Sequence, residues 1–307
     1  MCCSSSSSEA LPGSPHLVQG TYTALVTPFN KDGSVDYGAL RALVEAQAAA
    51  GIAGVCPVGT TGESPTLDYE EHEEVIRKTV EYTAGRMQVV AGTGGNSTRE
   101  AVELTRHAIA DGADATLQIA PYYNKPTPEG LYRHFSEVAD VGLPVLLYNA
   151  PGRTSRDIPV AVVKRLAGHP KIAGIKEAAG DANRVNLIRA AIGDKIDILS
   201  GDDSLTLPMM AAGAKGVVSV ASNVVPAEVV EMVRLALAND FAGALKIHTR
   251  LLDLFADLFI EVNPVPVKAA MAMLGTAQEV YRLPLCELLP EHREKLAATM
   301  KKLGLVK

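Results

Sequence analysis

Eight short apolar runs, each followed by a helix-like segment, constrain the fold of this 307-residue chain more than any other feature. Val, Ile and Leu fill these runs almost without interruption, which is typical of parallel strands covered on both faces. The runs are Thr21–Thr27, Gly54–Val58, Gln88–Ala91, Ala115–Ala120, Val145–Asn149, Ile172–Lys176, Asp197–Ser200 and Gly216–Val220. Eight strands that each precede a helix predict an α/β protein with a (β/α)8 TIM barrel.

A doubly wound open sheet is the competing architecture. Such a sheet usually carries a glycine-rich phosphate loop directly after its first strand, whereas this first strand ends in Thr27-Pro28-Phe29-Asn30. The later run Gly92-Thr93-Gly94-Gly95 does not match that pattern either. The barrel is therefore favoured, and no nucleotide cofactor is expected.

The strand pattern stops after Ala238, and the remaining segments have helical periodicity. The expected helices are Phe241–Phe259, Pro264–Leu274 and Glu291–Leu303. The sequence thus predicts a catalytic barrel over 18–238 and a C-terminal helical extension, 239–307, that packs on the barrel. The apolar face of the first of these helices could instead meet another subunit, but covering the barrel is favoured.

Composition narrows the classes of partner. A net charge of −6 and the lack of any long basic run argue against nucleic acid. The longest apolar stretches are too short to span a membrane. The four cysteines fit neither a zinc site nor a disulfide framework, which favours a reducing, cytoplasmic location. Residues 1–17, which are rich in Cys and Ser, are expected to form a disordered tail without a secretory signal.

Lys176 is the first candidate catalytic residue, because it ends the predicted strand Ile172–Lys176. The apolar residues before it would surround its amine, and burial disfavours the charged form of a lysine, leaving a neutral nucleophile. A strand that simply ends in solvent is the alternative interpretation. Other strand ends decide between the two, because barrel enzymes take their catalytic residues from one rim.

Three further strand ends carry suitable chemistry. Gly59-Thr60-Thr61-Gly62-Glu63-Ser64 could bind a carboxylate through hydroxyls and backbone N–H groups. Tyr148 could relay protons with help from Thr60, and Arg153 could bind a second carboxylate bidentately. Asp202 and Asp203 lack a supporting ligand cluster and are interpreted as helix caps, so no metal is expected. The residues alone indicate a Schiff-base enzyme that acts on a small keto acid.

Together, five motifs resemble dihydrodipicolinate synthase, the 4-hydroxy-tetrahydrodipicolinate synthase family, from about residue 18 to residue 303. The motifs are Gly59 to Ser64, Tyr122 to Pro126, Tyr148 to Thr154, Gly174 to Ala178 and Ser200 to Asp203. The resemblance implies condensation of pyruvate with L-aspartate 4-semialdehyde through a Schiff base on Lys176, in the diaminopimelate route to lysine, without a cofactor. It also implies a homotetramer built from two tight dimers.

The resemblance implies roles for individual residues. Thr60, Tyr148 and Tyr123 would relay protons, with Tyr123 reaching into the neighbouring subunit's site. Thr60 and Thr61 would hold the pyruvate carboxylate, and Arg153 the carboxylate of the aldehyde. Val218 would line the pyruvate pocket, and Gly201 belongs to the same substrate-binding set.

Some members of this family are inhibited by lysine at the tight-dimer interface. The matching positions here are Ser64, His72, Asn96, Glu100 and Tyr122. Pro65 and Tyr69 depart from the small and the basic residue usual beside them, which leaves inhibition by lysine open. The alternatives for the function are another pyruvate-forming class I aldolase, acting on a 2-keto-3-deoxy sugar acid, 4-hydroxy-2-oxoglutarate or N-acetylneuraminate, and a non-catalytic ligand-sensing barrel. A metal-dependent aldolase is disfavoured by the missing ligand cluster.

Overall fold

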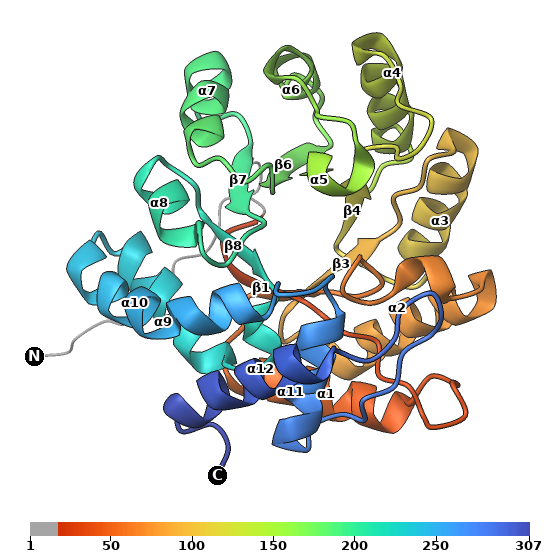
Figure 1. Cartoon of the computed structure of the whole chain (residues 1–307). Coiled ribbons are helices and arrows are strands. Elements are labelled where there is room, and N and C mark those ends of the chain that lie inside the picture. Colours follow the sequence, from red (N-terminus) through yellow and green to blue (C-terminus); the bar gives the residue numbers. More distant parts are fainter. Residues whose placement is uncertain (1–17) are drawn as a thin grey trace, which may run out of the picture.

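The computed structural model describes residues 18–307, and its strands form one closed parallel barrel (Figure 1). Each strand pairs with its sequence neighbours, and β8 returns to β1. The strands are β1 (Gly20–Ala24), β2 (Gly54–Cys56), β3 (Gln88–Gly92), β4 (Ala115–Ile119), β5 (Val145–Asn149), β6 (Ile172–Glu177), β7 (Asp197–Ser200) and β8 (Gly216–Ser219). The predicted TIM barrel is confirmed. The predicted tail, residues 1–17 with Cys2 and Cys3, lies outside the described residues.

Helices surround the barrel, as Figure 1 shows for α2 to α9. They are α1 (Tyr37–Ala49), α2 (Tyr69–Thr83), α3 (Thr98–Ala110), α4 (Pro128–Ala139), α5 (Pro151–Thr154), α6 (Val160–Leu166), α7 (Asn183–Ile192), α8 (Thr206–Ala211) and α9 (Pro226–Leu237), with the 3₁₀ turns η1 (Ser64–Thr66) and η2 (Ala221–Asn223). Local sequence sets their ends. In α2, the Asp68 side chain caps the Glu71 N–H while the Glu71 side chain accepts from the Asp68 N–H.

Four strands end earlier than the sequence predicts: β4 and β8 by one residue each, β2 by two and β1 by three. The prediction extended β1 to Thr27. The Leu25 N–H still donates to the Cys56 carbonyl of β2, but the next N–H, that of Val26, donates to the Asn223 side chain instead. β2 ends at Cys56 because Pro57 has no N–H to donate and the backbone of Val58 turns left-handed, with φ of 48°. A tertiary contact thus ends β1, and local backbone features end β2, before the apolar runs end.

Three helices follow the barrel: α10 (Phe241–Asp257), α11 (Val265–Leu274) and α12 (Pro290–Lys302). Helix α10 packs against α9 and α12, and α11 packs against α12 and η2. On α10, Leu251, Leu254 and Phe255 are buried, as expected for a face that covers the barrel, whereas Phe259 just beyond it stays exposed. The division into units at residue 238 stays a prediction.

Candidate active site

Lys176 and Tyr148 lie side by side on the adjacent strands β6 and β5, where the register pairs them directly. Lys176 is only 6% exposed, and its Nζ lies 4.2 Å from the centroid of the Tyr148 ring. An ammonium over an aromatic face is a cation–π contact, which holds the amine at a fixed position. The alternative interpretation, a strand that simply ends in solvent, is therefore wrong.

Glu177, the next residue on β6, takes no part in this contact. Successive side chains of a strand alternate between faces, so Glu177 points into the helix layer, where Arg184 and Asn149 bind its carboxylate at 3.2 and 2.9 Å. Burial raises the pKa of this carboxyl, while Arg184 and Asn149 oppose the shift. Its contacts serve to fix the strand rather than to exchange protons with Lys176.

Space for the lysine side chain depends on Gly201, directly after β7. A Cβ at position 201 would lie 2.7 Å from the Ala178 Cβ and 3.1 Å from Cγ and Cε of Lys176. The Gly201 N–H donates to the Glu177 carbonyl at 2.8 Å, which keeps the two chain segments close. Val218 is buried on β8.

The two aspartates that follow Gly201 have different roles. Asp202 accepts from the N–H groups of Ser204 and Leu205, which precede α8; the N-cap of that helix is Leu205 and no side chain caps it, so the predicted capping role is wrong. Asp203 does not cap this helix: it is buried and accepts from the Ser219 hydroxyl and from the N–H groups of Val220 and Ala221. It links the chain after β7 to the end of β8. Burial raises the pKa of its carboxyl, and those donors lower it.

The loop after β2 presents Thr60 and Thr61 at the same rim. It is tightly turned, since the N–H of Gly62 donates to the Gly59 carbonyl and the N–H of Glu63 to that of Thr60. Thr60 lines a pocket that opens at this rim. Thr61 is buried, and its hydroxyl accepts from the Asn263 side-chain amide at 2.9 Å.

Arg153 belongs to the short helix α5 after β5, and its exposed guanidinium borders the same pocket. One guanidinium nitrogen donates to the backbone carbonyl of Asn263 at 3.2 Å. Asn263 thus contacts both Thr61 and Arg153. The other guanidinium N–H groups have no carboxylate partner among the described residues, so an anion in the pocket can bind them.

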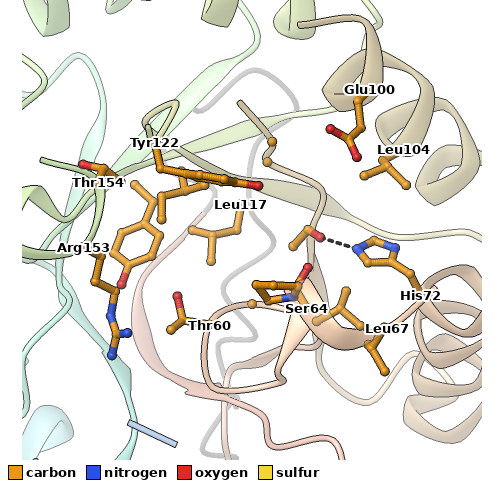
Figure 2. Close-up of a pocket in the computed structure, with 18 of the residues that line it drawn as sticks. Thr60, Ser64, Leu67, His72, Glu100, Leu104, Leu117, Tyr122, Arg153 and Thr154 are labelled. Carbon is orange, nitrogen blue, oxygen red and sulfur yellow. Dashed lines mark hydrogen bonds between the residues drawn. The ribbon is translucent and has the colours of Figure 1, made fainter. Parts of the chain in front are cut away.

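A pocket of about 510 Å³ joins these residues to a second group at its far end. Figure 2 shows Arg153 and Thr154 at one end and His72 and Glu100 at the other, with Tyr122 and Leu117 between them. Tyr148 lines this pocket. Four other candidate residues are not among those that line it: Thr61, Lys176, Gly201 and Val218. Of the two neighbours Lys176 and Tyr148, only Tyr148 lines this pocket.

Four of the five residues assigned to a lysine-inhibitor site line the far end: Ser64, His72, Glu100 and Tyr122. The fifth, Asn96, donates to the Tyr122 carbonyl at 3.3 Å. His72 is buried with one ring nitrogen 2.9 Å from the Gly92 carbonyl, and burial lowers its pKa. Burial and the Glu100 charge raise the pKa of Tyr122.

Tyr69 changes this far end. Its hydroxyl donates to the Glu100 carboxylate at 2.6 Å, and this hydrogen bond raises the pKa of Tyr69. The carboxylate expected to meet an ammonium ligand already has a partner.

Tyr123 does not join the site within this chain. It is 91% exposed, and its φ of 71° places it in the left-handed region that few residues other than glycine adopt. The loop after β4 thus projects an aromatic side chain away from its own barrel.

Residues 18–307 contain no group of three or more His, Cys, Asp or Glu side chains arranged to hold a metal ion. Within the same range no helix combines the length and apolarity needed to cross a bilayer.

Three residues near the rim escaped prediction: Asn263, Lys268 and Glu63. Asn263 and Lys268 come from the chain around α11, about 200 positions after the loop they contact, and no local pattern places them there. One signal for Lys268 does exist. It is the only charged residue in the apolar helix α11, Val-Pro-Val-Lys-Ala-Ala-Met-Ala-Met-Leu.

A closed barrel with a buried lysine beside a tyrosine at its rim defines the class of Schiff-base-forming lyases. Residues 17–303 match the model of the Dihydrodipicolinate synthetase family. A curated 4-hydroxy-tetrahydrodipicolinate synthase from Aquifex aeolicus (strain VF5) is 52% identical over 291 residues, which cover 94% of this chain and 99% of the relative. The chain belongs to the dihydrodipicolinate synthetase family and is an enzyme of that class.

Solved structures of dihydrodipicolinate synthases also resemble this chain. Dihydrodipicolinate synthase from Acinetobacter baumannii, solved in complex with pyruvate, superposes with a TM-score of 0.92 at 43% identity, covering 94% of this chain and 99% of that one. The enzyme from Cyanidioschyzon merolae, solved with lysine bound, has a TM-score of 0.91 at 40% identity, covering 95% and 100%.

Proposed function

We propose that this chain is a 4-hydroxy-tetrahydrodipicolinate synthase, which condenses pyruvate with L-aspartate 4-semialdehyde for lysine synthesis by the diaminopimelate route. The observation that carries the proposal is the buried amine of Lys176 against Tyr148, at a rim that also bears Thr60 and Arg153. The relative solved with pyruvate supports a keto acid as the first substrate.

The chemistry begins when the Lys176 amine gives up its proton and attacks the pyruvate ketone, and water leaves to give an imine. Loss of a methyl proton turns the imine into an enamine, whose carbon attacks the aldehyde of the second substrate. The amino group of that substrate then displaces Lys176 and closes the ring, which regenerates the enzyme. Every step moves protons, so a relay must lie within reach of the imine.

Tyr148 and Thr60 supply the relay within this chain, because both line the pocket and the Tyr148 ring contacts Lys176. Tyr123 completes it from a neighbouring subunit. Thr60 and Thr61 hold the pyruvate carboxylate through hydroxyls and backbone N–H groups, while Val218 and Gly201 shape the wall around the imine. A glycine at 201 leaves room for the substrate as well as for Lys176.

Arg153 binds the carboxylate of the semialdehyde. Its exposed guanidinium borders the pocket. A planar fork of donors binds a carboxylate better than it binds a neutral sugar chain. This feature favours the synthase over a class I aldolase for sugar acids or N-acetylneuraminate.

The proposed assembly is the homotetramer, a dimer of dimers, that the family resemblance implies. The exposed Tyr123 supports the dimer within it, because this side chain needs a partner subunit to reach a site. The proposed location is the cytoplasm, and neither nucleic acid nor membrane is a partner. The units are a barrel over 18–238 and a helical segment over 239–307 packed on it.

Ser64, His72, Asn96, Glu100 and Tyr122 form a candidate lysine site, supported by a family member solved with lysine bound. Because Tyr69 already binds Glu100, we expect lysine to inhibit weakly. Titrating lysine into the assay of the wild type and of Tyr69→Phe tests this, and stronger inhibition of the variant is expected. Strong inhibition of the wild type, unchanged in the variant, would contradict it.

The deciding experiment is borohydride reduction in the presence of pyruvate, followed by peptide mass analysis. A pyruvate-derived mass is expected on the peptide that contains Lys176 and absent from Lys176→Ala. Lys171→Ala, which removes an exposed lysine just before the same strand, is the matched control and should still be labelled. Label elsewhere or nowhere would sink the Schiff-base mechanism. Comparable or faster turnover of keto-sugar acids or N-acetylmannosamine would overturn the substrate assignment.

A further inference from the structure

A buried ion pair lies directly under the threonine loop after β2. The Lys268 ammonium donates to the Glu63 carboxylate, and neither side chain is exposed to solvent. Lys268 comes from α11, beyond the barrel, whereas Glu63 ends the sequence Gly59-Thr60-Thr61-Gly62-Glu63. No step of the mechanism above uses either charge.

Stability alone does not account for this pair. Taking two charges out of water costs about as much as their attraction returns, so an apolar pair of similar volume would serve a core equally well. Directed hydrogen bonds, in contrast, fix geometry. Glu63 receives two from the C-terminal segment: one from Lys268 on Oε1, and one from the Arg282 N–H on Oε2 at 3.3 Å.

The geometry held at Glu63 is an unusual one. Its φ of 54° is left-handed, and Val58 at the other end of the loop has φ of 48°. The loop is therefore not at its own conformational minimum and needs outside contacts to keep its shape. Thr27 supplies one through its bond to the Gly62 carbonyl at 2.7 Å.

Neighbouring contacts tie the same two regions together. Asn263 donates to the Thr61 hydroxyl and accepts from Arg153. The Arg282 guanidinium binds Glu71 and the Thr66 carbonyl, and it lies 4.5 Å from the Phe29 ring. Lys268 lies 4.2 Å from the same ring. The C-terminal segment thus contacts the threonine loop at Thr61 and at Glu63, and it also contacts Arg153 opposite the loop.

We propose that Lys268, through Glu63, is a positioning residue that holds Thr60 and Thr61 in the shape that receives the pyruvate carboxylate. The inference rests on the function proposed above. It makes the chain after the barrel a working part of the active site. Neither Lys268 nor Glu63 touches the substrate, so their loss should weaken pyruvate binding while leaving the Lys176 amine reactive.

The test compares Glu63→Gln/Lys268→Met with the wild type. The double variant removes both charges at similar volume, so it should fold. Lys268→Met alone leaves the buried Glu63 carboxylate without its cationic partner, so this variant should have a much lower melting temperature. Borohydride trapping is then titrated with pyruvate. The double variant should need about 10- to 100-fold more pyruvate for half-maximal labelling, because a displacement near 1 Å has effects of that size. At saturating pyruvate Lys176 should be labelled fully.

Glu231→Gln/Arg234→Met on α9 removes an exposed ion pair remote from the rim and is the matched control, with unchanged half-saturation expected. A folded double variant with wild-type half-saturation would overturn the inference. Should the double variant not fold, Glu63→Gln alone decides: the inference stands if its half-saturation rises and fails if it does not. Absence of label on wild-type Lys176 would instead defeat the proposed function itself.

Discussion

At the residue scale, the Tyr148 hydroxyl is the smallest group on which the mechanism depends. Tyr148→Phe keeps the ring against Lys176 and removes only the proton-relaying oxygen. We expect kcat to fall by roughly 10²- to 10⁴-fold, the usual size of general acid–base catalysis, with an unchanged melting temperature. Steady-state assay and thermal melting measure the two. Tyr132→Phe, whose ring packs against Arg165 on the helix layer, is the control. A Tyr148→Phe enzyme with near-normal kcat would remove Tyr148 from the relay.

Loss of Arg153 is expected to weaken binding of the second substrate only. Arg153→Ala should raise the KM for L-aspartate 4-semialdehyde by about 10- to 150-fold, the equivalent of the ~1.5–3 kcal/mol typical of a hydrogen bond to a charged group. The pyruvate concentration needed for half-maximal trapping should not change. Arg133→Ala, which removes an exposed guanidinium from α4, serves as the control. A shift confined to pyruvate would reassign Arg153 to the first carboxylate.

At the element scale, the approach of β6 to the chain after β7 sets a strict size limit at Gly201. Gly201→Ala places a methyl group 2.7 Å from the Ala178 Cβ, an atom fixed to the backbone that can move only if the strand moves. Overpacking of this kind costs about 1–3 kcal/mol and should displace Lys176 as well. We therefore expect a lower melting temperature together with slower borohydride trapping.

Gly168→Ala is the matched control for that substitution, because a Cβ at position 168 meets its nearest atom at an ordinary 3.4 Å. It should leave both the melting temperature and the trapping rate close to those of the wild type. If Gly201→Ala behaves in the same way, β6 and β7 have more freedom than their contacts indicate.

Most elements could be predicted from sequence because their signals are local. β5 and β7 match the predicted bounds, since β-branched and leucine runs specify strands buried on both faces. β2 ends before Pro57, which is a local signal. The end of β1 could not be predicted, because the side chain of Asn223, which follows the neighbouring strand β8 and lies 197 positions later, binds the Val26 N–H. Asn263 could not be predicted for the same reason, because its partner Thr61 lies 202 positions earlier in the sequence. In contrast, Thr60, Tyr148 and Lys176 could be predicted as a group, because parallel strands bring their carboxyl ends to one rim.

At the scale of the whole molecule, Tyr123 is the one residue of the proposed relay that faces away from its own pocket. A side chain that is 91% exposed on a left-handed backbone is poorly placed to serve a monomer. In a closed two-fold dimer the same surface of each subunit faces the other. If one subunit places Tyr123 in its partner's site, the partner therefore places its own Tyr123 in the site of the first. The proposed active site is then a property of the dimer.

Mixing two inactive variants tests this arrangement. Lys176→Ala lacks the nucleophile but keeps Tyr123, whereas Tyr123→Phe keeps the nucleophile but lacks the relaying hydroxyl. In a mixed dimer, the site with an intact Lys176 receives an intact Tyr123 from its partner. Co-refolding equal amounts should therefore restore activity to about a quarter of the wild-type value, because half of randomly formed dimers are mixed and each has one working site. If Tyr123 acts within its own subunit, no site in any mixture is complete, and the activity of the mixture stays at the average of the two variants alone.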